Sequence, residues 1–98
     1  MTKVIFRVDE RDHQKEVIAV LPDQAGDMNP ERTCAAYIHT GQHVAISADY
    51  TEWTRPATPD EYKDILSELV SFGYDDLQIY QKSSYADFLS RKEQTRRG

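Results

Sequence analysis

Residues 58–73, TPDEYKDILSELVSFG, decide the fold because they predict one amphipathic helix with both ends marked. The Thr58 hydroxyl can accept from the amide of Glu61, whose carboxylate can reach back to the Thr58 amide, as in a capping box. Proline suits the first helical position because its missing amide would be unpaired there anyway. Gly73 can stop the helix in the left-handed conformation, so we predict a helix over 59–72. Its apolar residues recur at helical spacing: Tyr62, Ile65, Leu66, Leu69, Val70 and Phe72.

Short runs on both sides of this helix are predicted to be strands, since they alternate and are rich in β-branched and aromatic residues. They are 3–8 (KVIFRV), 16–21 (EVIAVL), 34–39 (CAAYIH), 77–82 (LQIYQK) and, as a strand or an irregular turn, 43–48 (HVAISA). The helix must bury its apolar stripe, and an antiparallel sheet offers one apolar face. We therefore predict an α+β two-layer sandwich in the order β-β-β-(β)-α-β. Its antiparallel sheet has four to five strands, with the helix packed on one face.

Residues 1–82 are predicted to form a single domain, and residues 83–98 a C-terminal tail. The tail, SSYADFLSRKEQTRRG, has one apolar turn formed by Tyr85, Phe88 and Leu89 and then becomes basic. We expect it to be partly helical and then disordered, as chain ends often are. Its apolar turn could dock on the body or on a second copy, so a homodimer through the tail is one alternative.

Net charge and cysteine content limit the binding partners and the cellular compartment that we expect for the chain. The 98 residues carry a net charge of −5, and the tail is basic, so the body is more acidic than the whole chain. An acidic body repels nucleic acid phosphates, and we expect no direct nucleic acid binding. It suits a partner protein with a basic, nucleic-acid-binding surface, although the charge could also serve solubility alone. The single cysteine, the lack of a signal peptide and the lack of a membrane-spanning run indicate a cytoplasmic protein with no membrane attachment.

Cys34, His39 and His43 are the obvious metal candidates, but their C-x4-H-x3-H spacing is no common zinc pattern. Strand alternation places Cys34 and His39 on opposite faces, so Cys34 is predicted to be a small core residue. Gly41 opposes a helical H-x3-H site, and Thr40 stands where a zinc protease has its glutamate. We expect no cofactor and no enzymatic activity. A small enzyme or metal protein centred on His39 and His43 remains the alternative.

A second group is typical of protein recognition, because tyrosine, tryptophan and arginine dominate protein interfaces. It consists of Tyr37, His39, Gln42, His43, Asp49, Tyr50, Trp53 and Arg55. We expect Tyr37 and His39 on the exposed face of the sheet, beside the turn that carries Gln42 and His43. The alternative is that Tyr37 and Trp53 fill a second hydrophobic cluster.

A third group is acidic. Asp60, Asp64 and Glu68 are spaced i, i+4, i+8 and form one stripe along the predicted helix, with Asp75 and Asp76 near its end. Adjacent members lie roughly 6 Å apart, close to the phosphate spacing of one nucleic acid strand. The stripe is either a solvated helix face or a mimic of nucleic acid that binds a basic surface.

Several segments together resemble a family of small proteins encoded by bacterial mobile elements and phages. The segments are KVIFRV, EVIAVLPD, GDMNP, YIHTGQH, ADY, TRPATPDEY and GYDDLQIY, which cover most of residues 3–82. The resemblance implies no catalytic residue. It implies a context in which small acidic proteins disable host defence machinery, as anti-CRISPR proteins do. Our hypothesis is a non-enzymatic inhibitor of a nucleic-acid-handling host complex, with a structural dimerising module as a further alternative.

Overall fold

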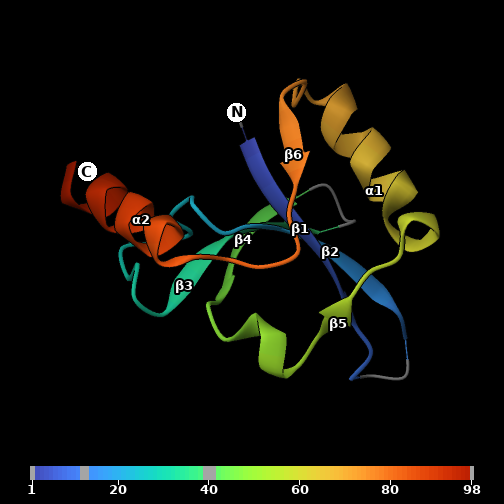
Figure 1. Cartoon of the computed structure of the whole chain (residues 1–98), viewed down its shortest axis with the longest axis horizontal. Helices are drawn as coiled ribbons and strands as arrows, with labels where there is room; N and C mark the ends of the chain where they lie inside the picture. Colours follow the sequence, from blue (N-terminus) through green and yellow to red (C-terminus); the bar gives the residue numbers. More distant parts are fainter. Residues whose placement is uncertain (1, 12–13, 39–41, 98) are drawn as a thin grey trace.

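The computed structural model describes residues 2–11, 14–38 and 42–97 and has one sheet with a helix on either side of it (Figure 1). The elements follow the chain as β1 (Thr2–Asp9), β2 (Glu16–Leu21), β3 (Thr33–Ile38), β4 (Gln42–Ser47), the 3-10 helix η1 (Tyr50–Glu52), β5 (Arg55–Pro56), α1 (Pro59–Ser71), β6 (Leu77–Ile79) and α2 (Tyr85–Arg97). The predicted α+β class is confirmed, and the segment left open between strand and turn is strand β4. No helix in these residues has the length and apolar character needed to cross a membrane.

Strand β1 holds the sheet together. Along one edge it pairs antiparallel with β2, and β3 and β4 follow outward. Its other edge is divided between two short strands, β5 at Arg7 and Val8 and β6 at Thr2–Val4. The β6 pairing is parallel, a difference from the predicted all-antiparallel sheet. A parallel partner requires a crossover connection rather than a hairpin, and the segment containing α1 supplies it.

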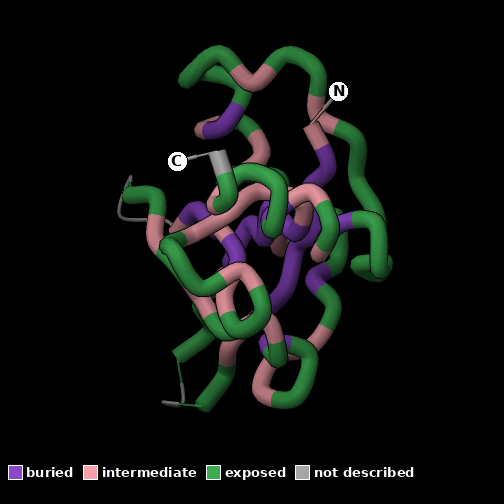
Figure 2. Tube along the Cα trace, turned by 90° about the vertical axis from the view of Figure 1, so that its left-hand side faces the viewer, coloured by how far each residue is buried: buried purple, intermediate pink, exposed green. Residues whose placement is uncertain are grey.

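Both faces of the inner strands β1, β2 and β3 are largely buried, and Figure 2 shows such buried stretches of the chain in purple. Residues of α1 such as Ile65 and Leu69 pack on one face against Phe6. The opposite face carries a second cluster: Ile5, Ile18, Val20, Cys34, Ala36 and Tyr50, with Trp53 packed against it. The predicted role of Cys34 as a small core residue is confirmed. The sheet therefore has two apolar faces, where the two-layer prediction had assumed one.

Helix α2 is longer and better anchored than the predicted tail. It runs for 13 residues to Arg97, whereas we expected a short helical part followed by disorder. Asp87 is buried and accepts from Lys3 Nζ at 2.8 Å and from the Ser84 amide at 2.7 Å. Arg91, also buried, donates to the carbonyl oxygens of Pro22 and Pro30. Polar contacts thus tie α2 to the first strand and to the loop after β2.

We predict that Asp87→Asn strongly destabilises the fold. The Lys3 and Asp87 side chains are only 10% and 7% exposed, and the substitution removes the charge of the carboxylate that accepts from the buried ammonium. Breaking such a buried pair typically costs about 3 kcal/mol or more, which urea denaturation near pH 7 would measure as a lower free energy of unfolding. Asp64→Asn, at an exposed helical position, should change it by less than about 0.5 kcal/mol. Equal stability of the two variants would contradict the anchoring role of Asp87.

Candidate functional site

Tyr37 faces helix α1, so the prediction that it stands on an exposed sheet face is wrong. Its side chain is fully buried, and its hydroxyl donates to Glu68 Oε1 at 2.8 Å. In the sheet register Tyr37 lies opposite Ala19, which in turn lies opposite Phe6 on the face that α1 covers. Strand alternation assigned Tyr37 to the face opposite Cys34 correctly, but both faces of this sheet are covered. His39, its predicted companion, lies outside the described residues.

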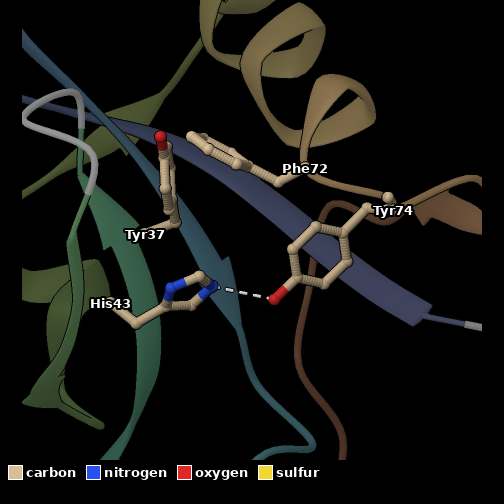
Figure 3. A pocket seen from close by; sticks show the side chains of 5 residues that line it. Tyr37, His43, Phe72 and Tyr74 are labelled. Atoms are coloured by element: carbon tan, nitrogen blue, oxygen red, sulfur yellow. Dashed lines mark hydrogen bonds between the residues drawn. The ribbon is translucent and has the colours of Figure 1, made fainter.

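An open hollow of about 400 Å³ lies above Tyr37 and is lined by Tyr37, His43, Phe72, Gly73 and Tyr74. The rings come from β3, from β4 and from the segment that follows α1 (Figure 3). His43 Nε2 and the Tyr74 hydroxyl oxygen are 2.8 Å apart and share a hydrogen bond. The ring centroid of Tyr37 lies 5.2 Å from that of His43 and 5.9 Å from that of Phe72. Tyr37 and His43 belong to the predicted recognition group, whereas Phe72, Gly73 and Tyr74 were not predicted as site residues.

Gly73 explains how the two rings after α1 reach the sheet. Its φ of 100° lies in the left-handed region that glycine adopts without strain. The Gly73 amide donates to the Val70 carbonyl and the Tyr74 amide to the Leu69 carbonyl, which is the Schellman pattern of helix closure. The predicted helix stop is thus confirmed. The reversal carries Tyr74 to the start of β4 and leaves Phe72 with 61% of its surface exposed.

The predicted acidic stripe of α1 is only partly exposed. Asp60 and Asp64 are exposed, but Glu68 is half-buried against Tyr37. Four residues advance a helix by slightly more than one turn, about 40° too far, so an i, i+4, i+8 row winds around the axis. By its third member the row has reached the sheet. Burial and the hydrogen bond to Glu68 raise the pKa of Tyr37 to about 12, so the phenol stays protonated and donates.

Two further acids continue this side of the molecule beyond the helix. Asp75 and Asp76 are both exposed and follow Tyr74 directly in the chain. Asp76 also accepts from the Thr2 hydroxyl at 2.8 Å, which fastens the segment to the start of β1. The structure therefore places Asp60 and Asp64 in the first two turns of α1, and Asp75 and Asp76 directly after the segment that lines the aromatic hollow.

The remaining members of the predicted recognition group do not join this surface. Tyr50 and Trp53 pack on the opposite face of the sheet, where the Arg7 guanidinium lies 5.8 Å from the centroid of the Tyr50 ring. Gln42 and Asp49 are exposed. The described members of the predicted recognition group therefore do not form one continuous surface. The alternative of a second hydrophobic cluster holds for Trp53, with Tyr50 in the place proposed for Tyr37.

Arg55, the last member of that group, braces β5 against α1. Its guanidinium donates to both carboxylate oxygens of Glu61, at 2.8 and 2.6 Å, and also to Glu10. Glu61 accepts from the Thr58 amide at 2.9 Å as well, and the predicted capping box is confirmed. The hydrogen bonds from Arg55, assisted by the Thr58 amide, hold the pKa of Glu61 at about 2. These contacts assign Arg55 a structural role.

The chemistry of the candidate metal and nucleophilic residues is limited. Cys34 lies on the sheet face opposite Tyr37 and His43, and burial raises the pKa of its thiol to about 11. Such a thiol is poorly nucleophilic near neutral pH. Within residues 2–11, 14–38 and 42–97, no three histidine, cysteine, aspartate or glutamate residues are grouped to hold a metal ion. The described part of the hollow offers aromatic faces and a polar His43–Tyr74 pair, which are groups suited to binding.

We predict that Glu61→Gln destabilises the protein in a pH-dependent way. The folded-state pKa of Glu61 lies below its ordinary value of 4.5, so its ionised form stabilises the fold fully above about pH 4.5. That contribution disappears as the pH falls through about 2. The midpoint of thermal unfolding, followed by circular dichroism, should be lower for the variant near pH 7. This gap should close between about pH 4.5 and 2.

Glu31→Gln is the matched control, because Glu31 is an exposed acid in a loop. Its unfolding midpoint should follow that of the wild type near pH 7. A Glu61→Gln gap that stays constant down to about pH 2 would show that lost packing, and not the Arg55 ion pair, causes the destabilisation.

Comparison of the chain with known proteins found no relative. No protein-family model matches the chain, and neither curated proteins nor solved structures give a match. The resemblance to small mobile-element proteins therefore stays a prediction from sequence segments. What the chain binds has to be inferred from the contacts, exposure and charge of its own residues.

Proposed function

We propose that this chain is a small acidic binding protein that occupies a basic, nucleic-acid-binding surface of another protein. The observation that carries the proposal is the exposed acidic side of α1. Asp60 and Asp64 lie along the helix, and Asp75 and Asp76 lie beyond its end, three and four positions after the exposed Phe72. Carboxylates one helical turn apart, roughly 6 Å, can meet cationic groups spaced to hold successive phosphates.

The stiffness of α1 supports this function. The capping box at Thr58 and the Schellman closure at Gly73 fix both ends of the helix, and Ile65 and Leu69 anchor it in the core. Carboxylates on such a helix are already ordered before binding, which lowers the entropic cost of association. Complementary charge also accelerates encounter with a basic partner.

Apolar contact would supplement the charges. Val70 and Phe72 are 53% and 61% exposed near the C-terminal end of α1. Large apolar side chains that become desolvated commonly supply most of the binding energy, while surrounding charges set orientation and specificity. The proposed interface therefore centres on Phe72 and is flanked by acids.

The proposal also names the class of protein to which the partner belongs. A basic surface that a helix with phosphate-like charge spacing could occupy is typical of nucleases and other nucleic-acid-handling complexes. Together with the mobile-element-like segments, this favours a host defence complex, with a CRISPR effector as the leading candidate. The protein would act in the cytoplasm by steric and electrostatic blockade, without catalysis and without a cofactor.

We predict that the double variant Asp60→Lys/Asp64→Lys loses partner binding. The partner would first be captured from a bacterial lysate with the wild-type chain and identified by mass spectrometry. Isothermal titration calorimetry with the purified partner should then show at least a roughly tenfold weaker affinity for the variant, because two attractive contacts become repulsive. Wild-type binding should also weaken as salt rises.

Glu31→Lys is the matched control, because it reverses an exposed acid in the loop before β3 and leaves α1 unchanged. It should bind the partner with nearly wild-type affinity. A double variant that binds as tightly as Glu31→Lys would contradict the acidic surface as the interface.

We also propose self-association through α2 as a second candidate, since Tyr85 and Leu89 are 72% and 46% exposed one turn apart. Tyr85→Ser/Leu89→Lys removes this apolar pair while keeping the anchors Asp87 and Arg91. Light scattering should give a dimer mass for the wild type and a monomer mass for this variant. A monomeric wild type at about 100 μM would reject the dimer.

A further inference from the structure

We propose that the aromatic hollow binds the guanidinium group of an arginine side chain presented by the partner. This inference rests on the proposed function, because it names the group on a basic partner surface that the site recognises. It adds a specific pocket to an interface otherwise argued from surface charge.

The rings of the hollow supply the first part of the argument. The rings of Tyr37, His43, Phe72 and Tyr74 stand around it (Figure 3), and that of Tyr37 is fully buried. Aromatic faces attract cations, and the planar guanidinium of arginine stacks on them more readily than the compact ammonium of lysine. None of the five lining residues is a lysine or an arginine.

The position of Glu68 supplies the second part. It lies one helical turn before Phe72, and its Oε1 atom is 2.8 Å from the hydroxyl oxygen of Tyr37. A carboxylate has about four lone-pair positions, so it can accept from Tyr37 and from further donors at once. Arginine pairs with carboxylates through parallel N–H donors. The ligand would thus meet an aromatic wall in which the Tyr37 hydroxyl is bonded to an acid.

Charge also excludes the opposite kind of ligand. Glu68, which holds the Tyr37 hydroxyl, and Asp75, which follows Tyr74 in the chain, would repel a phosphate or another anion. An aliphatic group would leave the polar edge of the His43–Tyr74 pair poorly matched. A flat cation with an apolar stem satisfies both requirements, and the volume of about 400 Å³ leaves room for one such side chain.

The test uses the full chain labelled with ¹⁵N and three blocked tripeptides, acetyl-Gly-Xaa-Gly-amide. Xaa is arginine, citrulline or lysine, and citrulline keeps the shape of arginine but lacks its charge. We expect the arginine peptide to shift the amide signals of His43, Gly73 and Tyr74 in a saturable way. The citrulline peptide should bind roughly threefold to tenfold more weakly, as lost cation–π and ionic contacts imply. Absence of shifts at about 20 mM arginine peptide, or equal binding of citrulline, overturns the inference.

Two variants locate the binding in the hollow. Phe72→Ala removes an exposed ring, and Glu68→Gln removes the charge while its amide oxygen can still accept from Tyr37. Each should weaken arginine binding roughly threefold or more. Met28→Ala, at an exposed apolar position in the loop before β3, should leave it unchanged. Unchanged binding in both hollow variants would place the cation elsewhere and refute the proposal.

Partner binding separates this inference from the proposed function. If Asp60→Lys/Asp64→Lys loses the captured partner but Glu68→Gln keeps it with wild-type affinity, the acidic surface stands and the arginine pocket is rejected. If Phe72→Ala and Glu68→Gln lose the partner and the double lysine variant retains it, the pocket stands and the acidic stripe is rejected.

Discussion

Strand β1 is the constraint on which the rest of the structure depends. Its six residues from Lys3 to Val8 are buried, and both of its edges are paired. One edge extends the sheet through β2, while the other is divided between β5 and β6, which flank α1 in sequence. The ends of the α1 segment are therefore both fixed on a single strand. This fixes the path of α1 over one face, and with it the positions of Phe72 and Tyr74.

The sequence predicts α1 well because its signals are local. The capping box at Thr58, the apolar spacing and Gly73 each act within a few residues, and the structure has all three. The same holds for β1 to β3, whose residues alternate or run apolar over short distances. Cys34 was correctly assigned to the core. Strand alternation also placed it correctly on the face opposite Tyr37, and both faces carry a buried cluster.

Features that depend on distant contacts escaped prediction. Tyr37 was placed on an open face because only one face of the sheet was expected to be covered. Nothing local reveals that Tyr50 and Trp53 cover the face of Cys34, while α1 covers the face of Tyr37. Helix α2 has a weak apolar pattern and docks through Asp87 and Arg91, residues that sequence reasoning assigns to solvent. The hollow was predicted in part. Tyr37 and His43 were predicted as site residues from their residue types. Phe72 and Tyr74 were not, because their sequence indicates only a helix end, and the approach to β4 depends on the chain reversal at Gly73.

The Lys3–Asp87 contact has a consequence for how the protein is made. Its two residues are 84 positions apart, and β6 joins the same strand only after most of the chain has been synthesised. A contact of such high sequence separation raises the entropic cost of loop closure during folding, and folding is slower as a result. During translation, β1 has to wait beside β2 with its second edge unpaired, a state prone to association with other strands. For this fold, rapid completion of the chain and help from a chaperone that shields strand edges would matter more than the strength of any single local element.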